Sequence, residues 1–181
     1  ENLGNYSQAK DYYLQALEFW KSNTNLIWLS NIHNNLGVLY QMMGEYVDAY
    51  EAFEQGLKYA RADGYARMEA FNWIGIGDVY AELQVDEQAM QAYYMAEVIA
   101  DKAQEHFLQV YIKIQKAILM SYSNDFNASN NLLKQAYDLV GIDGTSMEKH
   151  LIDLEYAGIK IRQGKINEVL LMLENACHFF E

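Results

Sequence analysis

The fold of this chain is decided by residues 44–57, which read Gly44-Glu45-Tyr46-Val47-Asp48-Ala49-Tyr50-Glu51-Ala52-Phe53-Glu54-Gln55-Gly56-Leu57. Three of them, Ala49, Phe53 and Gly56, follow the i, i+4, i+7 spacing of one helix face. The same small–large–small face returns every 40 residues, at Ala9, Tyr13 and Ala16, at Ala89, Tyr93 and Ala96, at Ser129, Leu133 and Ala136, and at Val169, Leu173 and Ala176. A fixed period of this length predicts a stack of structural repeats.

Each repeat also has an upstream half, in which Leu36-Gly37 with Tyr40 corresponds to Ile76-Gly77 with Tyr80. Two helices approach closely where a small residue removes the side chain, and a neighbouring ring then fills the remaining space. The chain contains no proline to interrupt a helix. We therefore predict an all-α fold, a right-handed α-solenoid of antiparallel helix pairs. The first helices are expected near 26–42, 66–82, 106–122 and 147–162, and the second helices near 6–21, 46–62, 86–103, 126–140 and 166–180.

Packing and turns follow from the same register. We expect the buried residues to include Leu36, Tyr40, Ala49, Phe53, Ile76, Tyr80, Ala89 and Tyr93. Gly44 and Gly164 fall between helices, where glycine adopts a positive φ without steric cost.

These residues resemble the tetratricopeptide repeat, most closely over 34–57, and the resemblance covers the whole chain. The ordinary repeat has 34 residues and usually closes with a proline, whereas here the period is 40 and proline is absent. We therefore expect the second helix of each pair to run longer. The resemblance implies one repeat domain, 1–181, with registers near 1–25, 26–65, 66–105, 106–145 and 146–181, taken from a longer chain. Repeats of this length look like those of sensor arms in large bacterial transcription activators, kinesin light chains and spindle-orientation adaptors.

The family holds extended peptides or partner helices on an inner, concave wall formed by the first helices. Carried onto this sequence, the resemblance implies partner-binding residues at Asn31, Asn34, Asn35, Val38, Gln41, Phe71, Ile74, Asp78, Tyr111, Ile114, Gln115, Tyr122 and Arg162. Asn34 and Asn35 would present amides to a peptide backbone, because a carboxamide both donates and accepts hydrogen bonds. The lysine site of the chaperone-binding members falls on Asn34, Ile74, Ile114 or Leu154, so their carboxylate clamp is absent.

The composition and the absence of certain motifs argue against several other functions. The net charge of −12, with 13 basic and 25 acidic residues, argues against direct contact with nucleic acid or an anionic membrane. No apolar run reaches the roughly 18 residues of a membrane span. Cys177 is the only cysteine, which fits a reducing, cytoplasmic location and a buried, inert thiol. No phosphate-binding loop or His-Glu-x-x-His motif occurs. We predict no catalytic residue, cofactor or metal.

Three functions remain open: the sensor or docking arm of a larger bacterial transcriptional regulator, a stand-alone adaptor, and, more remotely, an enzyme or metal site assembled across the groove. The ligand is undefined at this stage. Apolar residues on the terminal helices, Tyr12, Tyr13 and Leu17 at one end and Leu170, Phe179 and Phe180 at the other, predict end-to-end self-association at high concentration.

Overall fold

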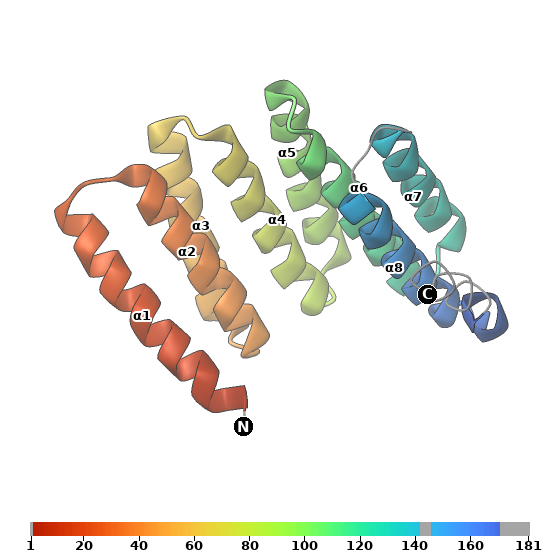
Figure 1. Cartoon of the computed structure of the whole chain (residues 1–181), viewed down its shortest axis with the longest axis horizontal. Helices are drawn as coiled ribbons and strands as arrows, with labels where there is room; N and C mark the ends of the chain where they lie inside the picture. The colour runs from red at the N-terminus through yellow and green to blue at the C-terminus, as the bar shows by residue number, and fades with distance from the viewer. Residues whose placement is uncertain (1, 142–145, 171–181) are drawn as a thin grey trace. The chain divides into compact units, whose positions relative to one another are not determined.

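The computed structural model describes residues 2–141 and 146–170, and these residues form eight α-helices and no strand (Figure 1). The helices are α1 (Asn2–Ser22), α2 (Leu26–Met42), α3 (Tyr46–Asp63), α4 (Ala66–Glu82), α5 (Asp86–Ala103), α6 (His106–Tyr122), α7 (Phe126–Val140) and α8 (Ser146–Arg162). Residues 166–170 are helical again. The all-α fold of consecutive helix pairs is thereby confirmed, and most predicted helix ends agree within a residue or two.

The two helices of a pair have similar lengths. The helices α3 and α5 have 18 residues each, against 17 in α2 and α4. In the following pair the second helix, α7, has only 15 residues against 17 in α6. The second helices α3 and α5 are thus each one residue longer than the first helix of their pair, and a second helix longer than that of the ordinary repeat stays a prediction.

The turns between helices repeat a left-handed residue at two fixed places. Positive φ occurs at Gly44, Gln84, Asn124 and Gly164, and again at Thr24, Gly64 and Gln104. Each series has a spacing of 40 residues. The left-handed residue lets the next backbone N–H reach back to the helix, as Glu45 N–H does to Tyr40 O at 2.9 Å and Val85 N–H does to Tyr80 O at 2.9 Å. The positive φ predicted for Gly44 and Gly164 is confirmed.

The helices divide into two compact units, Glu1–Leu108 and Gln109–Glu181. Each unit has its own core, and each is described separately below. One repeat domain over 1–181 stays a prediction.

In the first unit, glycines allow the close helix contacts that the sequence predicts. A Cβ atom added to Gly37 on α2 would lie 2.6 Å from the Phe53 ring of α3, and one added to Gly75 on α4 would also collide with that ring. Phe53 is fully buried and lies between the two glycine backbones. A Cβ at Gly77 would lie 2.5 Å from Tyr93 in the same way. The small and large positions of the repeat therefore pack as complementary pairs.

Most of the predicted core residues are buried, namely Leu36, Ala49, Phe53, Ile76, Ala89 and Tyr93. Two predictions need correction, because Tyr40 and Tyr80 are only partly buried. Their rings lie at the edge of the core, where the Lys10 ammonium lies 4.5 Å from the centre of the Tyr40 ring and Tyr50 meets Tyr80 edge-on. Tyrosine commonly takes such a position, because its hydroxyl group remains solvated.

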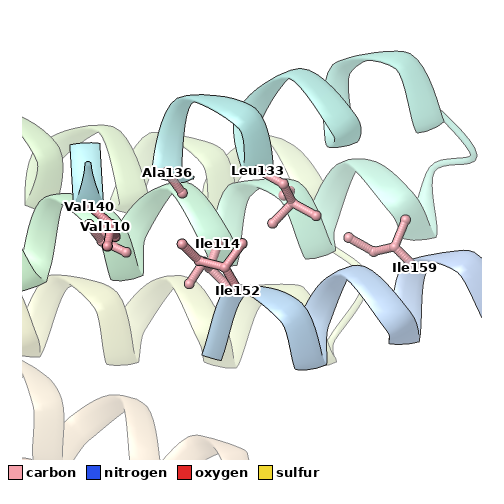
Figure 2. Packing of buried hydrophobic residues seen from close by; sticks show 8 residues of the cluster. Val110, Ile114, Leu133, Ala136, Val140, Ile152 and Ile159 are labelled. Atoms are coloured by element: carbon pink, nitrogen blue, oxygen red, sulfur yellow. The ribbon is translucent and has the colours of Figure 1, made fainter. Parts of the chain in front are cut away.

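The buried residues in the core of the second unit are all aliphatic, as Figure 2 shows from close by, and the partly buried Phe126 and Tyr156 pack against them. It contains Val110, Ile114 and Ala117 of α6, Leu133, Ala136 and Val140 of α7, and Ile152 and Ile159 of α8. Ala117 and Leu133 stand where the first unit has Gly37 with Phe53, so an alanine and an aliphatic side chain replace the glycine–ring pair here.

The apolar face predicted at the start of the chain is only partly as expected. Tyr12 is 62% exposed and Tyr13 is partly buried, but Leu17 is buried against α2, which corrects its assignment to the exposed face. Leu170 is 52% exposed. Phe179, Phe180 and Cys177 lie outside the described residues.

Candidate functional site

In the first unit, α2 and α4 are neighbouring first helices that contact each other. α2 also packs against α1 and α3, and α4 against α3 and α5. On α2 the side chains of Asn35 and Val38 remain exposed, and those of Asn31, Asn34 and Gln41 are half-buried. We call these residues, together with Phe71 and Asp78 of α4, the α2–α4 face. Its members come from the predicted inner wall, and the structure brings them together on two adjacent helices.

A buried polar network lies beneath the α2–α4 face. Asn72 of α4 is fully buried and donates to Met68 O at 2.7 Å and to Ser30 Oγ at 3.4 Å. Ser30 in turn donates to Gly56 O at 2.8 Å. These bonds tie α2, α3 and α4 together, because each polar group would be costly to bury without a partner.

Of Asn34 and Asn35, the two asparagines that the sequence singled out, only Asn34 bonds to this network. Asn34 donates to Asn72 Oδ1 at 3.5 Å, and Asn31 donates to the backbone carbonyl of Ile27 at 2.9 Å. Asn35 makes no side-chain hydrogen bond to any described residue and is exposed. Of the three asparagines on α2, Asn35 is therefore the one best able to bond an incoming backbone.

On α4, Asp78 is engaged in an internal contact. The Tyr93 hydroxyl group donates to Asp78 Oδ1 at 2.6 Å. Burial raises the pKa of Asp78 to about 7; the Tyr93 hydrogen bond opposes this shift, and the nearby Glu82 charge adds to it. Asp78 thus carries a fractional charge near neutral pH. Phe71 is half-buried, with the Arg67 guanidinium 5.9 Å from the centre of its ring.

Two predicted partner-binding residues do not reach the surface. Ile74 is 3% exposed and Ile114 is 1% exposed. Ile114 belongs to the core of the second unit. Their positions correspond to Asn34 in the repeat, so the assignment to the inner wall is corrected: where this position carries isoleucine, the side chain packs between helices rather than facing a ligand.

In the second unit, the structure joins two predicted residues that stand 40 positions apart. Arg162, at the end of α8, donates to Tyr122 OH at 3.1 Å and to Ser121 Oγ at 3.3 Å. Its guanidinium lies 4.4 Å from the centre of the Tyr122 ring. Tyr111 and Gln115 of α6 are half-buried. Tyr122 and Arg162 thus contact each other, and their assignment to an inner wall stays a prediction.

An exposed aromatic cluster at the α1–α2 turn was not predicted. Trp20 stacks on Trp28 with ring centres 5.5 Å apart, and Phe19 meets Trp20 edge-on. Trp28 is 50% exposed, although its counterparts one and two repeats later, Met68 and Leu108, are buried. Comparison of equivalent positions would have identified Trp28 as unusual.

No features of a chemical centre emerge among the residues that the structure describes. They contain no group of three or more His, Cys, Asp or Glu side chains placed to hold a metal ion. His33 stacks on Tyr59, and burial together with the Lys21 charge lowers the pKa of His33 to about 4. No helix in this part of the chain is both long and apolar enough to cross a membrane.

Comparison with known proteins agrees with the fold described above. Residues 1–62 match the family model of the tetratricopeptide repeat. This first part of the chain is therefore similar to tetratricopeptide repeats. Among solved structures it is similar to the crystal structure of the apo form of RapI, with a TM-score of 0.73 and 13% sequence identity over 94% of this chain. At that identity the likeness establishes the fold alone. The match spans 62% of the RapI chain. No curated protein matches the sequence.

Proposed function

We propose that this chain is a non-catalytic docking module that holds an extended segment of a protein partner on its first helices. Tetratricopeptide repeats support a role in protein interaction. The α2–α4 face in the first unit is the proposed binding surface for this segment. An extended segment offers backbone N–H and C=O groups, which a carboxamide can bond in both directions.

The observation that carries this proposal is the contrast between Asn35 and its neighbours. The small and aromatic positions of α2 and α4 are used in packing, and Asn31 and Asn34 already bond within the chain. Asn35 and Val38, one helical turn apart, are exposed and form no part of the core. They offer an amide and an apolar side chain side by side, which is the combination that a peptide-binding surface uses.

For the cellular role, we favour the sensor or docking arm of a larger bacterial transcriptional regulator that works in the cytoplasm. The long repeats support this role. A stand-alone adaptor is equally compatible with the repeats. The sequence of the complete gene would distinguish the two, since a regulator would add a DNA-binding or nucleotide-binding domain.

The test is a paired substitution on the α2–α4 face. A partner is first identified by affinity capture with the chain as bait, and its binding is then measured by titration calorimetry. Asn35→Ala combined with Val38→Ala should weaken binding at least tenfold, equivalent to about 1.4 kcal/mol. Both sites are exposed, so folding should be nearly unchanged.

Lys58→Ala, an exposed change on the neighbouring second helix α3, is the matched control and should leave the affinity unaltered. Equal affinity in the paired variant and the parent would place the binding surface elsewhere.

A further inference from the structure

The buried polar network beneath the α2–α4 face occupies positions that are apolar in the other repeats. Asn72 is fully buried. At a spacing of 40 residues, its equivalents are the buried isoleucines Ile32, Ile112 and Ile152. Ser30 is also fully buried, and the next two repeats carry buried Ala70 and Val110 in its place. One repeat interface therefore contains two buried polar side chains that the repeat pattern does not require.

Gly56 shows that the neighbouring backbone is adapted to Asn72. A Cβ atom added to Gly56 would collide with Asn72 Oδ1, so no larger residue fits while the amide keeps its place. The next two repeats carry alanine at this position, Ala96 and Ala136. Gly56 O also accepts the hydrogen bond of the Ser30 hydroxyl group at 2.8 Å. Glycine, serine and asparagine thus form one matched set across α2, α3 and α4.

Stacking of the helices does not explain this network. The core of the second unit packs through aliphatic side chains such as Val110, Ile114 and Ile152. In the first unit, a close helix contact is already made where Gly37 meets the Phe53 ring. Replacing a buried hydrogen-bonded pair by apolar groups of the same shape is often nearly neutral for stability. The reason for the network is therefore to be sought in the member that reaches the surface.

Asn34 is that member. It is half-buried on the α2–α4 face, and Asn34 Nδ2 donates to Asn72 Oδ1 at 3.5 Å. Asn34 Oδ1 accepts a hydrogen bond from no described residue and is not enclosed by the protein. Asn72 is itself held, because its Nδ2 donates to Met68 O at 2.7 Å. The nitrogen and the oxygen of a carboxamide point in different directions within one plane, so bonding the nitrogen inward directs the oxygen away from the network.

We propose that Asn72 is a positioning residue for partner binding, which orients the Asn34 carboxamide so that Asn34 Oδ1 accepts a backbone N–H of an extended partner segment. Asn35, the next residue, is exposed and makes no side-chain hydrogen bond to a described residue, so its amide is free to rotate. A held acceptor loses less conformational freedom on binding than a free one, which favours affinity. This inference rests on the proposed docking function and assigns an acceptor and its donor within it.

The experiment uses the full chain and a random library of heptapeptides with acetylated and amidated ends. The tightest peptide that the immobilised chain retains is synthesised with a methyl group on one backbone nitrogen at a time, which removes one N–H donor and keeps every side chain. At one position the methyl group should weaken binding to the parent chain roughly tenfold in titration calorimetry. Asn34→Ala should abolish this penalty at the same position, and Asn72→Ile should remove most of it. Asn72→Ala, which cannot overpack the core, should act in the same way.

Ser129→Ala is the matched control, because Ser129 is fully buried and donates to Ala117 O at 2.8 Å in the second unit without a bond to the network. It should leave the methylation penalty unchanged. A penalty that persists in both Asn72 variants, or an equal loss of affinity for all peptides alike, would overturn the positioning role, because a merely structural residue would not act on one N–H alone. The absence of any penalty specific to Asn34 would do the same and leave docking intact. Retention of no peptide by the parent chain would instead overturn the docking function together with the positioning role.

Discussion

Replacing Gly37 by alanine tests the packing on which the repeat depends. The new Cβ atom would lie 2.6–2.7 Å from three atoms of the Phe53 ring, roughly 1 Å short of an ordinary carbon–carbon contact of about 3.5–4.0 Å. The ring has little room to move toward α4, because the backbone at Gly75 also lies close against it. Overpacking of this kind costs about 1–3 kcal/mol, while alanine gains about 1 kcal/mol over glycine in a helix. The difference is a net loss of up to about 2 kcal/mol, and we expect a value near this upper end because the new atom would approach three ring atoms at once.

The assay is urea denaturation followed by far-ultraviolet circular dichroism. Gly158→Ala is the matched control, since Gly158 is also helical but its Cβ would meet nothing nearer than 3.8 Å. This variant should gain up to about 1 kcal/mol from helix propensity alone. If Gly37→Ala is as stable as the parent, or if both glycine variants change stability by the same amount, the close contact with Phe53 does not set the packing.

Three further predictions follow from the turns, the buried carboxyl group and the exposed aromatic residues. Gln84 has a φ of 59°, a left-handed conformation that is unfavourable for a residue with a Cβ atom. Gln84→Gly should therefore stabilise the first unit by about 0.5–1 kcal/mol in thermal denaturation, and a loss of stability would contradict this. The pKa of Asp78 is raised from an ordinary 3.8 to about 7, so the folded chain holds a proton that the unfolded chain releases. The contribution of Asp78 to the free energy of unfolding therefore falls as pH rises between about 4 and 7. Asp78→Asn should therefore be more stable than the parent by about 1–4 kcal/mol at pH 8 and similar to it at pH 4; a difference that does not change with pH would refute the shift. Tyr12→Ser with Trp28→Ser should reduce concentration-dependent association in light scattering, since these side chains are 62% and 50% exposed; a parent chain that stays monomeric at millimolar concentration would disprove it.

The pH dependence of the parent chain alone would be ambiguous. The pKa of His33 is lowered to about 4, so the unfolded chain binds a proton at His33 that the folded chain excludes, and stability falls as pH drops from about 6.5 to 4. This contribution opposes that of Asp78 over much of the same range. The difference between the parent and Asp78→Asn isolates Asp78, because His33 is common to both.

Much of the fold could be predicted from the sequence because each repeat contains the residues that its own helices and turns need. A helix face needs small and large side chains at fixed intervals, and a turn needs a residue that tolerates positive φ. Phe53 with Gly37, and the turn at Gly44, satisfy these requirements within a single repeat. Five copies of one period also compensate for weaker local signals, which is why α6 and α7 were predicted correctly although their pattern is looser.

The candidate site depended more on tertiary structure. The repeat register assigned Asn34 and Ile74 to one inner wall, but only the packed helices show that Ile74 is buried and that Asn34 bonds to Asn72. The contact between Asp78 and Tyr93 joins two helices, and no local spacing indicates it. A surface is whatever packing leaves uncovered, so equivalent positions in successive repeats can have different exposure.

The sequence by itself therefore determined the helices, their pairing and their turns, because these follow from interactions between residues near one another in the chain. Tertiary structure alone decided which inner-wall residues remain available, as it did for Asn35, and how Arg162 is held between Ser121 and Tyr122. The physical reason is that burial and hydrogen-bond partners depend on neighbours about 40 residues away, whose side chains vary from repeat to repeat while the backbone pattern does not.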